Sequence, residues 1–155
     1  MIARLLLSAL LLLLAPAAFS KPPAEWRFQD WPAAVATAEK TQKPLFVLFG
    51  FEQCPYCDHL YRHGMDSSDL RAKYQGSVVL SYYDTRAHGA DDPVRLPGGA
   101  TMTHAQFIKQ LRAYPTPSWL FLSPKGTVLQ ASRGSKTTSR ELLRDLEAAL
   151  AANRQ

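Results

Sequence analysis

Apolar and polar positions along the chain fall into blocks that predict alternating strands and helices. The nearly all-apolar run at 44–49 has the length of a strand buried on both faces, and the run at 77–83 is rich in residues that favour strands. A third run, at 118–122, leads through a turn at 123–126 into a β segment at 127–132. These last two segments therefore predict an antiparallel hairpin.

Helical patterns occupy the segments between these strands. Asp30 is a suitable N-cap for a helix over 33–40. Thr138 and Glu141 form a capping-box pattern ahead of the apolar stripe of a C-terminal helix. Three further helices are predicted: one from Cys54 to the break at Gly64, one over 69–74 that Gly76 ends, and one over 104–113 capped by Thr103.

The segment 86–100 is the least regular part of the pattern. It contains two prolines and three glycines, and we expect a surface loop there. With this loop as a connection, the order of elements predicts parallel strands joined by helices and closed by a hairpin and a final helix. The expected fold class is therefore α/β, with three layers and a central mixed sheet flanked by helices.

The first 20 residues have the features of a secretory signal peptide. Arg4 gives a short positive region, an apolar stretch follows, and 15–20 consists mainly of small residues. The apolar stretch is shorter than the ~20 residues of a membrane span, although an uncleaved anchor is the alternative. We expect cleavage after Ser20, with Ala17 as a second possibility, and hence a signal peptide at 1–20 and one periplasmic domain at 21–155.

Charge changes this picture little. The net charge is +5, and removal of 1–20, whose only charged residue is Arg4, leaves 17 Lys and Arg against 13 Asp and Glu. The basic residues are scattered along the sequence, whereas a nucleic-acid-binding protein carries them as a stripe or patch. We expect a solvated surface, no nucleic-acid partner and a monomeric chain.

The chain's two cysteines follow the first strand at a spacing typical of redox pairs. Cys54 lies where the strand gives way to a helix, with Pro55 in the first helical turn. Unpaired N–H groups and the dipole at a helix start favour a thiolate over a thiol. Cys54 is therefore the predicted nucleophile, and Cys57, one turn further and more buried, is the predicted resolving thiol of a redox-active disulfide.

Other interpretations of the pair remain open at this point. A purely structural disulfide would close too short a loop to constrain the unfolded chain much. A metal site would need further ligands from the four histidines, of which His59 and His63 share a helix face. We expect no metal and no organic cofactor, because the cysteine pair itself carries two electrons.

With these motifs in place, the chain from about Trp26 onward resembles the thioredoxin superfamily. The lead Lys43-Pro44-Leu45-Phe46-Val47 resembles that of the periplasmic thioredoxin-related group sometimes called SoxW-like, and Cys54-Pro55-Tyr56-Cys57 is similar to the motif of glutaredoxins. Thr116-Pro117, ahead of the strand at 118–122, is the second supporting signature.

The resemblance implies roles for the residues around the cysteines. In this superfamily the proline corresponding to Pro117 is cis and lies beside the cysteines, and Pro115 is the less favoured candidate for a cis bond. The backbone of Thr116 would then pair with an extended substrate segment. Tyr56, between the cysteines, would shape the docking surface.

Two positions depart from the thioredoxin pattern. Leu48 and Gln53 stand where thioredoxins usually carry a buried aspartate and a tryptophan. Glu52 is near in sequence and offers a substitute proton acceptor through water, or else a solvated turn residue. The departure puts general-base assistance to Cys57 in question.

The leading hypothesis is an exported thiol–disulfide oxidoreductase that exchanges disulfides with protein clients, as a reductant or in client-specific exchange. Its partners would be protein thiols or disulfides and a redox partner in the membrane or periplasm. A metal-binding or metallochaperone module that uses Cys54 and Cys57 is the main alternative. A redox-inert binding domain with a permanent Cys54–Cys57 disulfide is the third.

Overall fold

The computed structural model describes residues 21–134 and 138–155, so the predicted signal peptide at 1–20 lies outside the described residues. The helical elements are η2 (Ala24–Trp26), α2 (Trp31–Thr41), α3 (Pro55–His63), α4 (Ser68–Ser77), α5 (His104–Gln110) and α6 (Ser139–Ala152). The strands are β1 (Leu45–Gly50), β2 (Val79–Asp84), β3 (Pro93–Arg95), β4 (Thr101–Thr103), β5 (Ser118–Leu122) and β6 (Val128–Arg133). No helix in the described ranges has the length and apolar character needed to cross a bilayer.

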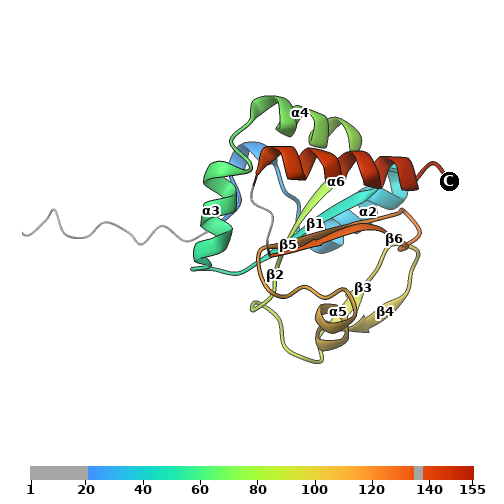
Figure 1. Cartoon of the computed structure of the whole chain (residues 1–155). Coiled ribbons are helices and arrows are strands. Elements are labelled where there is room, and N and C mark those ends of the chain that lie inside the picture. The colour runs from blue at the N-terminus through green and yellow to red at the C-terminus, as the bar shows by residue number, and fades with distance from the viewer. Residues whose placement is uncertain (1–20, 135–137) are drawn as a thin grey trace, which may run out of the picture.

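The main sheet has four strands in the order β2-β1-β5-β6 (Figure 1). The strand β1 runs parallel to β2 and antiparallel to β5, and β5 pairs antiparallel with β6. The predicted central mixed sheet and closing hairpin are therefore confirmed.

The side chains of β1 alternate between two cores, one on each face of the sheet. Phe46 and Leu48 pack with α3, α4 and α6, whereas Leu45, Val47 and Phe49 pack with α2, α5 and the β3–β4 hairpin. A strand buried on both faces has a continuous apolar sequence, because the side chains that point to either face of the sheet are both buried in a core. This arrangement is the predicted three-layer architecture, with α4 and α6 together on one side in Figure 1.

Caps set the starts of most helices as the sequence predicts. Asp30 accepts a hydrogen bond from the Ala33 backbone N–H at 3.0 Å. Both Thr103 and Thr138 form complete capping boxes. These side chains satisfy backbone N–H groups that have no partner inside the helix.

Helix α4 is longer than predicted. It runs from Ser68 to Ser77 and so passes through Gly76, which does not end it. The hydrogen bond from the Val78 N–H to the Tyr74 carbonyl, at 2.9 Å, closes the last turn. Burial of Leu70 and Tyr74 in the core outweighs the small helix penalty of one glycine. In contrast, α5 is shorter than predicted and ends at Gln110.

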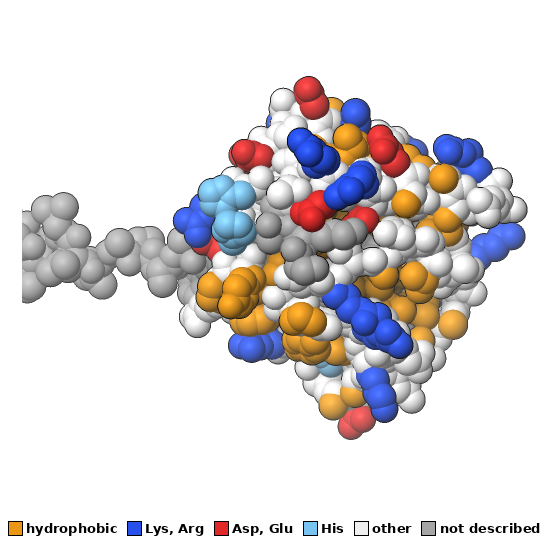
Figure 2. Space-filling view, in the orientation of Figure 1, with side chains coloured by type: hydrophobic (Ala, Val, Ile, Leu, Met, Phe, Trp, Pro, Cys, Tyr) orange, Lys and Arg blue, Asp and Glu red, His pale blue; other side chains and the backbone are white. Residues whose placement is uncertain are grey.

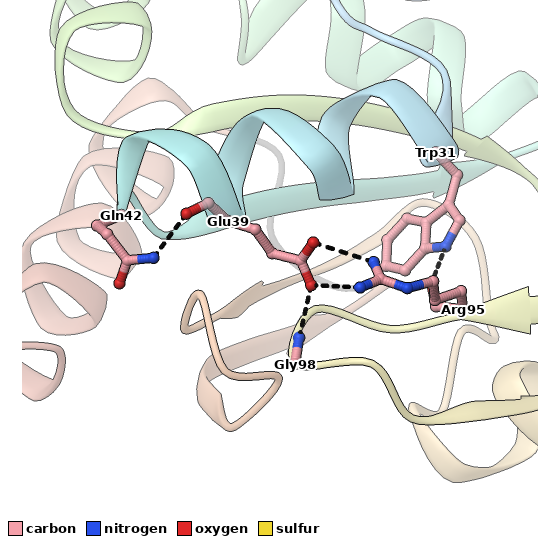
Figure 3. A network of polar contacts seen from close by, with 5 residues as sticks. All are labelled: Trp31, Glu39, Gln42, Arg95 and Gly98. Atoms are coloured by element: carbon pink, nitrogen blue, oxygen red, sulfur yellow. Dashed lines mark hydrogen bonds and ion pairs between the residues drawn. The ribbon is translucent and has the colours of Figure 1, made fainter.

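Part of the segment 86–100, which was predicted as a surface loop, belongs to a hairpin instead. In this hairpin β3 pairs with β4, which lies just beyond the segment, and Val94 and Leu96 are buried against the α2 side of the sheet. Figure 3 shows how α2 holds this hairpin. The Glu39 carboxylate accepts two bonds from the Arg95 guanidinium, at 2.9 and 3.1 Å, and a third from the Gly98 N–H at 2.9 Å.

A second contact in the same place fixes the start of α2. The indole N–H of Trp31 donates to the Arg95 carbonyl at 2.8 Å, and the Gln42 amide at the other end of α2 donates to the Glu39 carbonyl (Figure 3). The hairpin is therefore a part of the folded domain rather than a free excursion.

Candidate functional site

The cysteine motif lies at the carboxyl end of β1, where the chain turns into α3. Cys54 is the N-cap of α3, and its sulfur accepts the Cys57 backbone N–H at 3.2 Å. Pro55 occupies the first helical turn, as predicted, where its missing N–H costs no hydrogen bond. The Cys54 sulfur thus sits at the electropositive start of a helix, which stabilises negative charge on it after reduction.

Cys54 and Cys57 form a disulfide, with their Cα atoms 5.2 Å apart. The exposed fraction of Cys54 is 1% and that of Cys57 is 0%, so in this oxidised form burial does not separate the two residues as the sequence predicted. What separates them is the capping position, because the helix-start N–H points at Cys54.

The loop ahead of β5 packs directly against this disulfide. The Thr116 hydroxyl oxygen lies 3.6 Å from the Cys54 sulfur, and the Thr116–Pro117 peptide bond is cis. The Tyr114–Pro115 bond is cis as well, so the sequence-based choice of a single cis bond at Pro117 was incomplete. Both Thr116 and Pro117 are buried.

Two exposed aromatic side chains belong to the cysteine motif and to the loop that contains the cis prolines. Tyr56 is 73% exposed and Tyr114 is 46% exposed, which is unusual for such large side chains. In Figure 2 hydrophobic side chains gather near the start of α3, which is where the cysteine motif lies. Tyr56 is therefore an exposed aromatic side chain directly next to the two buried cysteines in the motif.

The structure shows the surroundings of Leu48, one of the two departures from the thioredoxin pattern, and of Glu52, the candidate substitute for the missing proton acceptor. Leu48 is fully buried in the core on the α3 side, so an apolar side chain fills that position. The Glu52 side chain is 52% exposed and lies 4.0 Å from the Lys21 ammonium. Glu52 is thus a solvated turn residue in this structure.

Two tyrosines approach each other at Gly50, the last residue of β1. A Cβ atom added at Gly50 would stand 3.1 Å from the Tyr82 hydroxyl oxygen and 3.3 Å from that of Tyr61. Burial raises the pKa of Tyr61, with Tyr82 adding to the shift, and burial raises the pKa of Tyr82 to about 12. The two phenols therefore stay uncharged well above neutral pH. Only the absence of a side chain at Gly50 could have hinted at this close approach.

The histidines of α3 lie on its exposed side. The rings of His59 and His63 are 4.5 Å apart, and Figure 2 shows histidine side chains over α3. Across residues 21–134 and 138–155, no three His, Cys, Asp or Glu side chains come together as a metal-binding group.

A family model for the thioredoxin-like domain matches residues 31–150. The chain belongs to this family. The match spans the sheet, the cysteine motif and the cis-proline loop described above. Among curated proteins, none matches the sequence significantly.

Solved structures agree on the fold. A thioredoxin from Thermus thermophilus superposes with a TM-score of 0.62 at 18% identity, over 81% of this chain and 89% of its own. A proposed disulphide isomerase from Bacteroides thetaiotaomicron gives 0.61 at 21% identity, over 79% and 91%. A disulphide isomerase from Xylella fastidiosa Temecula1 gives 0.52 at 15% identity, over 80% and 88%. At these identities the likeness establishes the thioredoxin-like fold.

Proposed function

We propose that this protein is a thiol–disulfide oxidoreductase that exchanges disulfides with protein clients. The observation that carries the proposal is the placement of Cys54, which caps α3 and lies 3.6 Å from the Thr116 hydroxyl beside cis-Pro117. Two titratable sulfurs at a helix start, next to a loop that can hold an extended chain, are the parts that disulfide exchange requires.

In the reducing direction, the Cys54 thiolate attacks one sulfur of a client disulfide. A Cys54–client mixed disulfide forms, and the other client sulfur leaves as a thiolate that takes up a proton. The Cys57 thiolate then attacks the Cys54 sulfur, which forms the Cys54–Cys57 disulfide and releases the second client thiol. Two electrons pass from the pair to the client, so a dithiol donor in the membrane or periplasm must reduce the pair again.

The environment of the pair differs from the thioredoxin pattern at the position of the usual proton acceptor. Leu48 supplies no proton acceptor, and Glu52 points to solvent, so Cys57 has no carboxylate nearby in these two positions. Proton transfer to and from Cys57 then relies on water or on the client. We propose client-specific exchange in the reducing direction on a different ground, the resemblance of the lead Lys43-Pro44-Leu45-Phe46-Val47 to the periplasmic SoxW-like group, to which we also propose that the chain belongs.

Export belongs to the same proposal. Cleavage after Ser20 would release a mature domain of residues 21–155 into the periplasm, where it would act as a monomer. Intact mass of the exported protein tests this: the expected N-terminal residue is Lys21, and retention of residues 1–20 would contradict it.

The first experiment is equilibration of the mature protein with glutathione buffers, with the oxidised fraction of Cys54–Cys57 as the readout. A potential near roughly −270 mV is expected for a reductant, and one near roughly −120 mV would reverse the proposed direction. Cys54→Ser should abolish exchange, whereas Cys57→Ser should trap mixed disulfides. No exchange at any glutathione ratio would overturn the oxidoreductase assignment, and metal retained at a 1:1 ratio would point to the metal-binding alternative.

A further inference from the structure

A cavity of about 770 Å³ lies beside the cis-proline loop, outside the cysteine motif. It is bounded by the segment after β2, by α5 and by the end of β6. Its apolar walls come from Ala90, Ala105 and Ile108. Its polar lining comes from His88, His104, Lys109, Arg112, Tyr114 and Arg133.

The cavity adjoins the loop that would hold a client. Tyr114 lines the cavity and directly precedes cis-Pro115. Arg133 also lines it and pairs with Ser118 in the β5–β6 ladder, and the next residue, Gly134, donates its N–H to the Pro117 carbonyl at 3.0 Å. A polypeptide lying along Thr116 can therefore continue into the cavity without leaving the surface.

The cavity lining carries positive charge and no carboxylate. Lys109, Arg112 and Arg133 supply the cations, and no Asp or Glu is among the lining residues. The ion pairs found among the described residues join Lys21 to Glu52, Arg62 to Asp58 and Arg95 to Glu39, so they involve neither Lys109 nor Arg112. Figure 2 shows Lys and Arg side chains gathered over α5, with hydrophobic ones between them and α3.

The floor of the cavity is held in place. Nδ1 of His104 and the Tyr83 hydroxyl are 2.8 Å apart, and burial raises the pKa of Tyr83 to about 12. This hydrogen bond joins the two side chains and limits their movement. The ring of His88 lies 4.9 Å from that of Tyr83 and 5.5 Å from that of His104. Preorganised donors lose less freedom when they bind.

We propose that this cavity binds an acidic segment of the client polypeptide, next to the disulfide that Cys54 exchanges. The inference rests on the proposed function and specifies its substrate class. Arg guanidinium groups bind carboxylates through paired hydrogen bonds, and Lys adds a point charge. The apolar walls accommodate the methylene groups of Glu side chains, and the shared edge with the cis-proline loop favours a segment of the client chain as the occupant.

The test uses the reduced mature protein and three synthetic peptides with the same intramolecular disulfide, flanked on both sides by Glu, Gln or Lys. The readout is the second-order rate constant for peptide reduction in single turnover. At low salt the Glu peptide should react about threefold to tenfold faster than the Gln peptide, and the Lys peptide should be slowest. The preference should fall towards one at 1 M salt, where the Debye length is about 3 Å.

Matched variants place the preference in the cavity. Lys109→Gln combined with Arg112→Gln should bring the Glu-to-Gln rate ratio close to one. The control combines Lys40→Gln on α2 with Lys73→Gln on α4, which removes the same charge from exposed positions outside the cavity. This control should keep the wild-type ratio.

Failures of the two proposals are distinguishable. Equal rates for the Glu and Gln peptides in an otherwise active protein would overturn the acidic-client inference and leave the oxidoreductase assignment standing. An unchanged ratio in the Lys109/Arg112 variant, or inhibition by a free dicarboxylate without any peptide preference, would also overturn the inference. No reduction of any of the three peptides would overturn the proposed function itself.

Discussion

On each face of the sheet a carboxylate links neighbouring elements, and these two carboxylates differ in how far they are buried. On the α6 face, Asp145 is only 3% exposed and accepts hydrogen bonds from the Trp119 indole and the Gln130 amide, both at 3.0 Å. On the α2 face, the Glu39 side chain is 29% exposed and binds Arg95 and Gly98 of the hairpin region.

This difference indicates which of the two carboxylates contributes more to the stability of the domain. Trp119 packs in the same core as Cys54 and Cys57. Asp145 therefore helps to fix α6 on the face of the sheet that also packs against the cysteines, here called the redox face. Glu39 holds a peripheral hairpin, and water and salt reach its ion pair. When a buried donor loses its acceptor, no water molecule can replace that acceptor, whereas water can accept a hydrogen bond from an exposed donor.

The largest expected effect is on Asp145. Asp145→Ala leaves the buried Trp119 N–H without this acceptor, and we expect a loss of about 2–4 kcal/mol of unfolding free energy. Urea unfolding of the oxidised protein, followed by circular dichroism, measures it. Glu147→Ala, at an exposed position of the same helix, is the control and should change little. If both variants lose the same small amount, the buried carboxylate is not a structural anchor.

A smaller effect is expected at Gly50, whose missing side chain leaves room for Tyr61 and Tyr82 on the redox face. Gly50→Ala places a methyl group 3.0 Å from the Tyr82 ring, and we expect a loss of about 1–2 kcal/mol. Gly76→Ala is the matched control, because nothing lies within 4 Å of the new Cβ. There we expect a gain of about 0.5–1 kcal/mol from helix propensity. A neutral Gly50→Ala would show that the tyrosines move apart readily.

The smallest effect is expected at Glu39, and it depends on pH. The Arg95 hydrogen bond, followed by that of the Gly98 N–H, lowers the pKa of Glu39 from its ordinary value of 4.5. A lowered folded-state pKa means that the stabilisation is present above 4.5 and is lost as the pH falls through the lower, folded value.

Glu39→Gln should therefore be less stable than the wild type at pH 7, and its loss of stability should be smaller than that of Asp145→Ala. In acid, the stabilities of Glu39→Gln and the wild type should become equal. Thermal unfolding at a series of pH values, each at low and high salt, measures this. A stability difference that persists unchanged to the acid end would show that hydrogen-bond geometry, and not charge, holds the hairpin.

Features set by neighbouring residues were predictable from the sequence. The caps Asp30, Thr103 and Thr138, the placement of Cys54 at a helix start and the strand at 118–122 all follow from a few adjacent side chains. Short-range hydrogen bonds and apolar periodicity suffice for these because the interacting groups lie within one or two turns of each other.

The errors arose where distant residues decide. The β3–β4 hairpin at 93–103 is held by Glu39, which is 56 residues away from Arg95 in the sequence. Helix α4 continues through Gly76 because its apolar side meets the core, and helix propensity alone is too weak to end it. The second cis bond, at Pro115, likewise has no local sequence signal that distinguishes it from Pro117.

The sequence by itself determined the α/β class, the cysteine pair at a helix start and the residues Thr116 and Pro117 as neighbours of that pair. These follow from local patterns and from a family resemblance that the motifs carry. Only the tertiary structure decided that Tyr61 and Tyr82 meet at Gly50, and that Lys109, Arg112 and Arg133 line one cavity beside the cis-proline loop. Scattered charges become a site only when the fold brings their elements together, and no local pattern encodes that distance.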